Sequence, residues 1–249
     1  MVDTALFVGM SGAKDSMRSL QVISNNLANA NTIGFQADYE TMKSYSDTQP
    51  GLQTRSYSAG GVTSSDFKPG PIIQTGGELD IAIMGPGFIA VQTKDGQEGY
   101  TRAGNLKITP EGLLLTSKGD MVLSDKGVIN IPLATKLNIN EFGEITAQLP
   151  GESAKQLAKL GNIKLVHIPP SSLQKGEDGL FHLMGDSEEP KADHTVKIQS
   201  GALEGSNVNS ILALTQLIDV SRQFEMHTKM MKNIEDNSSK SNQLLDGTA

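Results

Sequence analysis

Two stripes of apolar residues, one near each end of the 249-residue chain, constrain its fold more than any other feature. Both step by four and three residues, which is the heptad spacing of one face of an α-helix. The first predicts a helix over about residues 4–29. Its positions are Leu6, Met10, Ala13, Met17, Leu20, Ser24 and Leu27, of which only Ser24 interrupts the apolar pattern. The second predicts a helix that starts with Asn207 or Asn209 as its cap and runs to about Leu245. Its positions are Ala213, Leu217, Val220, Phe224, His227, Met231 and Ile234, and only His227 interrupts the apolar pattern.

Neither helix can bury its own stripe, and most of the stability of a helix in a protein comes from burying its apolar face. We therefore expect the two helices to pack on each other and on other molecules. A neighbouring face of the first helix carries only small residues, namely Gly9, Gly12, Ala13 and Ser16. Because an interior glycine costs up to about 1 kcal/mol relative to alanine, this face predicts a close approach of another backbone.

The middle of the chain follows a different pattern. Residues 46–78 are rich in Ser, Thr, Gly and Pro and show little periodicity, which predicts an extended connector. From Leu79 to about Lys197, short β-type runs alternate with the turn signals KDG, PEG, SKGD, SDKG and EFGE. This alternation predicts an all-β module, in which only ESAKQLAKL (152–160) suggests a short helix.

The expected fold class is therefore α+β. The terminal N- and C-terminal helices should pack as a coiled-coil-like pair, beside a central all-β module and an extended connector. The expected domains are a helical axial core of residues 1–35 and 205–249, a connector of residues 36–78 and a β-rich outer domain of residues 79–204.

Composition narrows the range of functions. The net charge of −7 and the lack of a basic block argue against nucleic acid or an anionic membrane as a partner. The absence of cysteine excludes a disulfide framework, a thiolate metal site and a cysteine nucleophile. The N-terminus has no basic region followed by an apolar core, and no run of 18 apolar residues occurs, so we expect neither a cleaved signal peptide nor membrane insertion as a helix.

No catalytic or cofactor motif passes the test of its context. Residues 85–90 match the dinucleotide fingerprint G-x-G-x-x-A, but that fingerprint must open a helix. The residues after it alternate as a strand, so a hairpin turn is the better interpretation. The histidines are scattered without metal-ligand spacing, and no calcium-loop pattern occurs. We expect no enzyme activity, no cofactor and no metal.

Several motifs resemble those of a known family. Residues 24–35, SNNLANANTIGF, follow a small-residue helix and resemble the N-terminal signature of bacterial flagellar axial proteins of the rod and hook class. Residues 200–209, SGALEGSNVN, resemble the lead into the terminal helix of that family, and residues 222–226 and 242–245 match it too. LDIAIMGPGFIAVQT and EGYTRAGNLKITPEGLLLTSKG are similar to the opening of its β domain. The similarity is strongest to proximal-rod subunits, with a distal-rod or hook-class subunit as the alternative, because residues 210–212 depart from the usual family pattern.

The resemblance implies a structural subunit of the basal-body rod, without an active site, that self-assembles helically and transmits torque from motor to hook. It implies export by the flagellar type III apparatus without signal cleavage, a place in the periplasmic rod, and proximal and distal rod proteins and copies of itself as partners. The asparagines would bond to adjacent subunits, Gly34 would let the chain turn and Phe35 would anchor it, although the asparagines could instead form a polar helix cap. The expected subunit-interface residues are Leu6, Met10, Gly12, Ala13, Met17, Leu20, Asn25, Asn26, Leu27, Asn29, Gly34, Phe35, Leu217, Val220, Phe224, Met231 and Ile234.

Two other functions compete with this one. A secreted β-rich adhesive or carbohydrate-active protein could use the helices as a stalk, and a nucleotide-dependent enzyme could use residues 85–90. Matched apolar stripes at both ends of the chain favour the structural subunit, because an enzyme does not need them.

Overall fold

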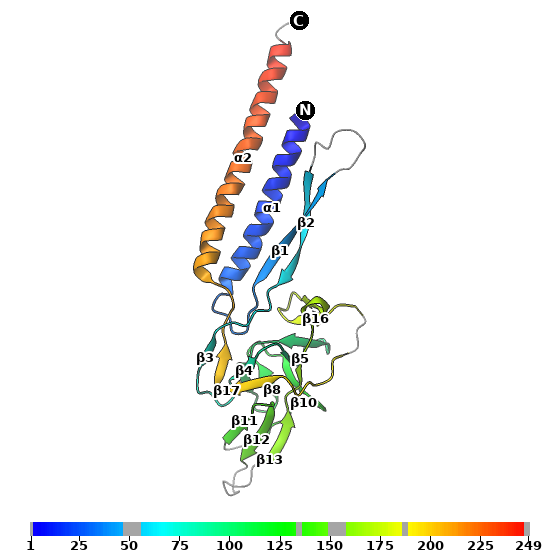
Figure 1. Cartoon of the computed structure of the whole chain (residues 1–249), viewed down its shortest axis with the longest axis vertical. Coiled ribbons are helices and arrows are strands. Elements are labelled where there is room, and N and C mark those ends of the chain that lie inside the picture. Colours follow the sequence, from blue (N-terminus) through cyan, green and yellow to red (C-terminus); the bar gives the residue numbers. More distant parts are fainter. Residues whose placement is uncertain (1, 47–55, 133–135, 149–157, 186–188, 247–249) are drawn as a thin grey trace. The chain divides into compact units, whose positions relative to one another are not determined.

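The computed structural model describes residues 2–46, 56–132, 136–148, 158–185 and 189–246 (Figure 1). The chain forms two compact units. The helical unit comprises residues 1–28, 38–64 and 209–249, and the β unit comprises residues 29–37 and 65–208. Each unit is therefore assembled from segments that lie far apart in the sequence. The domain boundaries expected from the sequence differ from these units at residues 29–78, which are divided between the two units, and at residues 205–208, which lie in the β unit. The expected boundaries stay a prediction.

The helical unit contains the two predicted helices, α1 (Val2–Ala28) and α2 (Ser210–Asp246), which lie side by side (Figure 1). Their bounds lie close to those predicted from the two stripes. The side-chain oxygen of Asn209 caps α2, because it accepts hydrogen bonds from the backbone N–H groups of Ile211 and Leu212, both at 3.1 Å. The α+β fold class with paired terminal helices is confirmed.

Part of the segment expected to be an extended connector forms regular structure. β1 (Asp38–Ser46) and β2 (Ser56–Ser65) make a two-stranded sheet, and β1 contacts α1. The Glu40 carboxylate lies 3.5 Å from the Arg18 guanidinium, and it accepts a hydrogen bond from the Ser19 hydroxyl at 3.4 Å. This irregular Ser- and Gly-rich sequence forms a strand because a neighbouring strand and helix supply the stabilising contacts. Such tertiary contacts cannot be predicted from local periodicity.

The β unit is built from several small sheets around one larger sheet. The larger sheet has the order β15-β16-β6-β5-β9-β8-β7, with β10 added on β9 and β14 on β5. Its strands are β5 (Phe88–Gln92), β6 (Glu98–Thr101), β7 (Leu106–Ile108), β8 (Leu114–Thr116), β9 (Met121–Ser124), β10 (Gly127–Val128), β14 (Leu165–Val166), β15 (Leu173–Lys175) and β16 (Phe181–Leu183). A three-stranded sheet contains β11 (Lys136–Ile139), β12 (Glu144–Gln148) and β13 (Ala158–Asn162). Two further pairs join β3 (Ile72–Gln74) to β18 (Ala202–Glu204), and β4 (Ile81–Met84) to β17 (Lys197–Ser200).

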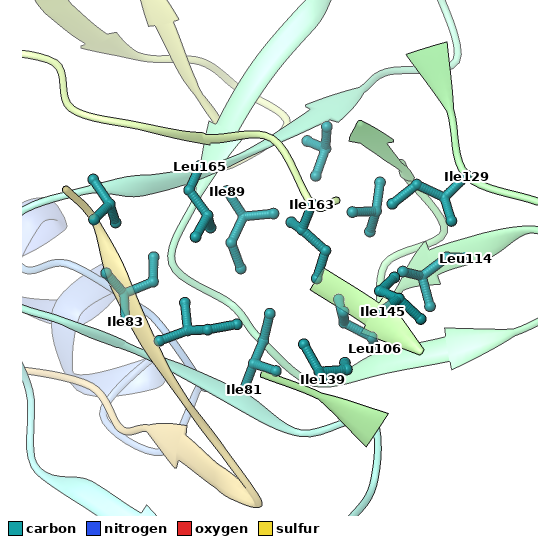
Figure 2. Close-up of a cluster of buried hydrophobic side chains, with 14 of the residues drawn as sticks. Ile81, Ile83, Ile89, Leu106, Leu114, Ile129, Ile139, Ile145, Ile163 and Leu165 are labelled. Carbon is teal, nitrogen blue, oxygen red and sulfur yellow. The ribbon is translucent and has the colours of Figure 1, made fainter. Parts of the chain in front are cut away.

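Strand β5 is central to the core because both of its faces are buried. Ile89 and Val91 belong to an aliphatic cluster, part of which Figure 2 shows, together with Ile81, Ile83, Leu114 and Ile145 among others. Phe88 and Ala90, which point to the opposite face of β5, belong to a second cluster with Tyr100 and Phe181. A short 3-10 helix (Pro170–Ser172) precedes β15. The predicted all-β module therefore has a buried hydrophobic cluster on each side of its central strand.

The turn signals read from the sequence are confirmed, and the suggested short helix is wrong where it can be described. Each of the five turns places its glycine at positive φ, at Gly96, Gly112, Gly119, Gly127 and Gly143. Of residues 152–160, the last three lie in strand β13, which pairs with β12, and residues 152–157 lie outside the described residues. Pairing with an adjacent strand prevails over a weak helical pattern in so short a segment.

Candidate assembly surface

The small-residue face of α1 is the face that packs against α2. Gly9, Ala13 and Ser16 are buried. A Cβ atom added at Gly12 would lie 2.6 Å from Cε1 of His227, and one added at Gly9 would lie 3.0 Å from Cγ of Met231. The helices are therefore antiparallel, and the close approach predicted at this face is made by large side chains of α2, not by its backbone.

The stripe predicted on α2 is confirmed as its inward face. All of its members from Ala213 to Ile234 are buried or half-buried, whereas most residues between them are exposed. The stripe predicted on α1 is divided. Ala13 is buried and Leu6, Leu20 and Leu27 are half-buried, but Met10 and Met17 are 52% and 55% exposed. Met10 and Met17 therefore lie outside the contact between the two helices, because the smaller neighbouring residues accept the bulky α2 side chains better.

Both helices also carry apolar side chains that point away from their partner helix. Phe7, Met10 and Met17 lie on one side of α1, and Ile211, Leu214 and Ile218 lie on one side of α2. We call these two groups the outer stripes. Their exposed fractions range from 45% for Ile218 to 79% for Ile211. Exposed apolar residues in regular rows on long helices are typical of surfaces that bind another protein.

The asparagine-rich run has roles inside the chain. The Asn26 side-chain amide makes two hydrogen bonds with the backbone of Asp38. Its Nδ2 donates to the Asp38 carbonyl at 2.7 Å, and its Oδ1 accepts from the Asp38 N–H at 2.8 Å. Asn29 accepts a hydrogen bond from the Thr32 hydroxyl at 3.1 Å. Asn25 is exposed. Part of the run therefore holds the exit of α1 in a fixed conformation, as a polar cap would.

The two terminal motifs meet in the β unit. The Gly34 N–H donates to the Glu204 carbonyl at 2.8 Å, and the Asn207 N–H donates to the Phe35 carbonyl at 3.3 Å. The Asn207 side chain accepts from the Ala37 N–H at 2.7 Å and donates to the carbonyls of residues 66 and 68 at 2.7 and 3.0 Å. Asn207, which the sequence offered as one possible cap of α2, instead ties three chain segments together.

At the centre of this contact lies a buried ion pair that sequence reasoning missed. Arg102 Nη2 is 2.7 Å from Glu204 Oε2, and the side chains are 2% and 1% exposed. The Glu204 carboxylate also accepts from the Gly70 N–H at 3.0 Å, and the buried Gln36 amide lies against it at 3.3 Å. Both residues lie in stretches that resemble family motifs, but nothing in the local pattern of those stretches pairs Arg102 with Glu204.

Arg102 also contacts the G-x-G turn, whose two glycines have positive φ. Arg102 donates to the Gly87 carbonyl at 2.8 Å and to the Gly85 carbonyl at 3.0 Å, so the turn serves as an acceptor for a side chain of the same chain. The turn is not a hairpin, because β4 pairs with β17 whereas β5 pairs with β6, β9 and β14. The predicted hairpin is therefore wrong.

Gly34 and Phe35 close the N-terminal motif. Gly34 has φ +69, and a Cβ added there would overlap the backbone of Arg102 and Ala103. The Phe35 ring has the Lys175 ammonium 4.0 Å above its centroid, and this ammonium also donates to the Gln36 carbonyl at 3.2 Å. The expectation that Gly34 permits a turn and that Phe35 anchors it agrees with this geometry.

A second partly desolvated ion pair lies on the larger sheet. Lys164 Nζ is 2.8 Å from Glu98 Oε1, with side chains that are 13% and 7% exposed. Burial raises the pKa of Glu98, and Lys164 partly offsets this rise. Burial, with the neighbouring Glu98 charge, also raises the pKa of the Tyr100 hydroxyl. The pair joins β6 to the start of β14 and so has a structural role.

Among the residues that the structure describes, no group of three His, Cys, Asp or Glu side chains could hold a metal ion. None of the helices described is long and apolar enough to cross a membrane.

Three segments of the chain, one at each end and one in the middle, match families of flagellar rod and hook proteins. Residues 6–36 match the family described as "Flagella basal body rod protein". Residues 82–147 match "Flagellar hook protein FlgE/F/G D1 domain", and residues 199–244 match "Flagellar basal body rod FlgEFG protein C-terminal".

Whole proteins of this kind match over almost their full length. The flagellar basal-body rod protein FlgF of Escherichia coli K12 is 36% identical, with 98% of this chain and 99% of that protein covered. FlgF of Salmonella typhimurium LT2 is 34% identical over the same shares, and FlgG of Agrobacterium fabrum C58 is 28% identical over 94% and 97%.

The paired terminal helices, the joined terminal motifs and these matches define the class as an axial structural protein of the flagellar basal body. The chain belongs to the FlgE/F/G family of flagellar rod and hook proteins, and within that family it is a FlgF-like rod subunit. Family membership implies a structural role and assembly with other axial proteins.

Proposed function

We propose that this chain assembles helically, with copies of itself and with proximal and distal rod proteins, into the periplasmic rod that transmits torque from motor to hook. It would reach the rod through the flagellar type III export apparatus without signal cleavage. The alternative is a role in the distal rod, since FlgG proteins are also similar to this chain, though at 28–29% identity against 36% for the FlgF of Escherichia coli.

The observation that carries this proposal is the pair of outer stripes. A lone subunit leaves Met10, Met17 and Ile211 largely exposed on long helices. Burying one such side chain contributes roughly 1.5–3 kcal/mol, so neighbouring subunits that covered the stripes would gain a large free energy of association. The helices would then form the inner part of the assembly, where every helix has neighbours on several sides.

The wider set of interface residues predicted from the sequence stays a prediction. In the single chain Met10, Met17 and Asn25 are exposed and so are the most accessible to another subunit, whereas Ala13 and Gly34 are buried. The other members are half-buried, and these are Leu6, Gly12, Leu20, Asn26, Leu27, Asn29, Phe35, Leu217, Val220, Phe224, Met231 and Ile234.

Charged substitutions on the outer stripes test this proposal. Met17→Glu and Ile218→Glu should each leave the isolated chain as stable as wild type, because both side chains are about half exposed. In a strain lacking the natural gene, each variant should abolish swimming in soft agar, since a carboxylate would be buried between subunits without a partner.

Met17→Leu and Ile218→Leu are the matched controls, since they keep an apolar side chain at the same position and should support normal swimming. Immunoblots of culture and cell fractions would show that each variant is made and exported. Normal swimming of both Glu variants would contradict the proposal that the outer stripes contact other subunits.

The close packing of α1 on α2 gives a second prediction. Gly12→Leu should separate the helices, because its side chain would occupy the place of the His227 ring, and swimming should be lost while the β unit stays folded. Gly9→Ala should have a much smaller effect, since the added Cβ meets only the flexible Met231 side chain at 3.0 Å.

The double variant Gly12→Leu with His227→Ala should recover part of the swimming, because it makes room for the new side chain. The measurements are motility in soft agar and circular dichroism of the purified chain. Full motility of Gly12→Leu alone would show that this face is not a tight contact.

A further inference from the structure

The C-terminal motif completes the β unit through contacts with residues far away in the sequence. The Asn207 side chain bonds residues 170, 141 and 139 positions earlier, and Glu204 bonds Gly70 and Arg102, which lie 134 and 102 positions earlier. By contrast, the pairings of the larger sheet include local ones, such as Ile89 with Thr101 and Leu106 with Thr116.

The same segment supplies strand partners to two short strands. β18 pairs with β3 and β17 pairs with β4, and each pair forms a two-stranded sheet. Strand β4 contributes Ile81 and Ile83 to the aliphatic cluster, to which β17 adds Ile198. Among the strands described, β3 and β4 have no other ladder partner, so their ladder hydrogen bonds depend on residues 197–204.

The buried ion pair depends on the same segment. Arg102 can be enclosed at 2% exposure only when Glu204 is in place, because a buried guanidinium without its carboxylate is strongly destabilised. Bringing Glu204 to Arg102 closes a loop between residues that are 102 positions apart. The conformational entropy lost in closing that loop is offset only when the contacts between its ends have formed. Local pairs in the larger sheet need no such closure, and they can form first.

We propose that residues 202–207 act as a latch, which closes on Arg102, Gly34 and Ala37 after the folding transition state of the β unit and thereby sets how long the folded unit persists. An interaction that is absent from the transition state affects the unfolding rate and leaves the folding rate unchanged. The latch therefore gives the β unit kinetic stability, independently of which proteins the subunit assembles with.

Folding and unfolding rates of the full-length chain test the proposal. The rates are measured across urea concentrations, with pulsed hydrogen exchange and mass spectrometry reading peptides that cover β5 and β6. Glu204→Gln should raise the unfolding rate on the order of 100-fold or more and leave the refolding rate within about twofold, since it removes the charge that pairs with buried Arg102. Ile89→Val, in the centre of the larger sheet, is the comparison and should slow refolding.

Asn207→Ala serves as the second variant if Glu204→Gln does not fold. It should raise the unfolding rate by a smaller factor and leave the refolding rate nearly unchanged. Refolding slowed in either latch variant to the extent seen in Ile89→Val, with unfolding unchanged, would overturn the proposal. So would latch variants that alter neither rate.

Discussion

Replacing Gly34 with alanine is expected to unfold the β unit. The residue has φ +69, which costs an alanine roughly 1–2 kcal/mol. The added Cβ would also overlap the backbone of Arg102 and Ala103, which cannot rotate away as a side chain can. The two effects combined should lower the free energy of unfolding of the β unit by more than about 4 kcal/mol. A complemented strain that carries this variant should not swim.

Gly76→Ala is the matched control for this substitution. Gly76 has nearly the same backbone conformation, with φ +71, but a Cβ added there meets nothing within 4 Å. In this control the free energy of unfolding should fall only by the cost of placing alanine at positive φ, about 1–2 kcal/mol. The free energies of unfolding of the two variants are compared by urea unfolding, monitored through hydrogen exchange of the β5 amides. Equal losses in the two variants would mean that the close approach at Gly34 contributes nothing.

Breaking the buried ion pair should have an effect of similar size. Arg102→Met leaves the Glu204 carboxylate buried and without its charge partner, which should destabilise the β unit by about 3–5 kcal/mol. The loss includes the hydrogen bonds that Arg102 donates to the carbonyls of Gly85 and Gly87.

The double variant Arg102→Met with Glu204→Leu should be more stable than Arg102→Met alone, because no charge remains buried. Lys197→Met is the control, since its partner Glu141 is 3.3 Å away and both side chains are more than half exposed; it should cost less than about 1 kcal/mol. The free energies of unfolding come from urea titrations. A double variant that is less stable than the sum of the two single changes would contradict this account of the pair.

Local sequence patterns determined the two terminal helices and the turns of the β unit, but not strands β1 and β2. The stripe from Ala213 to Ile234 predicted both the extent and the inward face of α2, since residues three and four positions apart lie on the same side of a helix. The turn signals located five glycines at positive φ. Motif resemblance gave the family, which the whole-length matches confirm.

Tertiary contacts decided which surfaces meet. On α1 the stripe with Met10 and Met17 and the small-residue face are adjacent, and periodicity cannot say which of two neighbouring faces a partner will cover. The answer depended on the shape of His227 and Met231 on the opposite helix. Likewise, Arg102 and Glu204 are 102 positions apart and the two ends of the Asn207–Ala37 bond are 170 apart. Such contacts leave no periodic mark in the sequence, because folding alone brings their partners together.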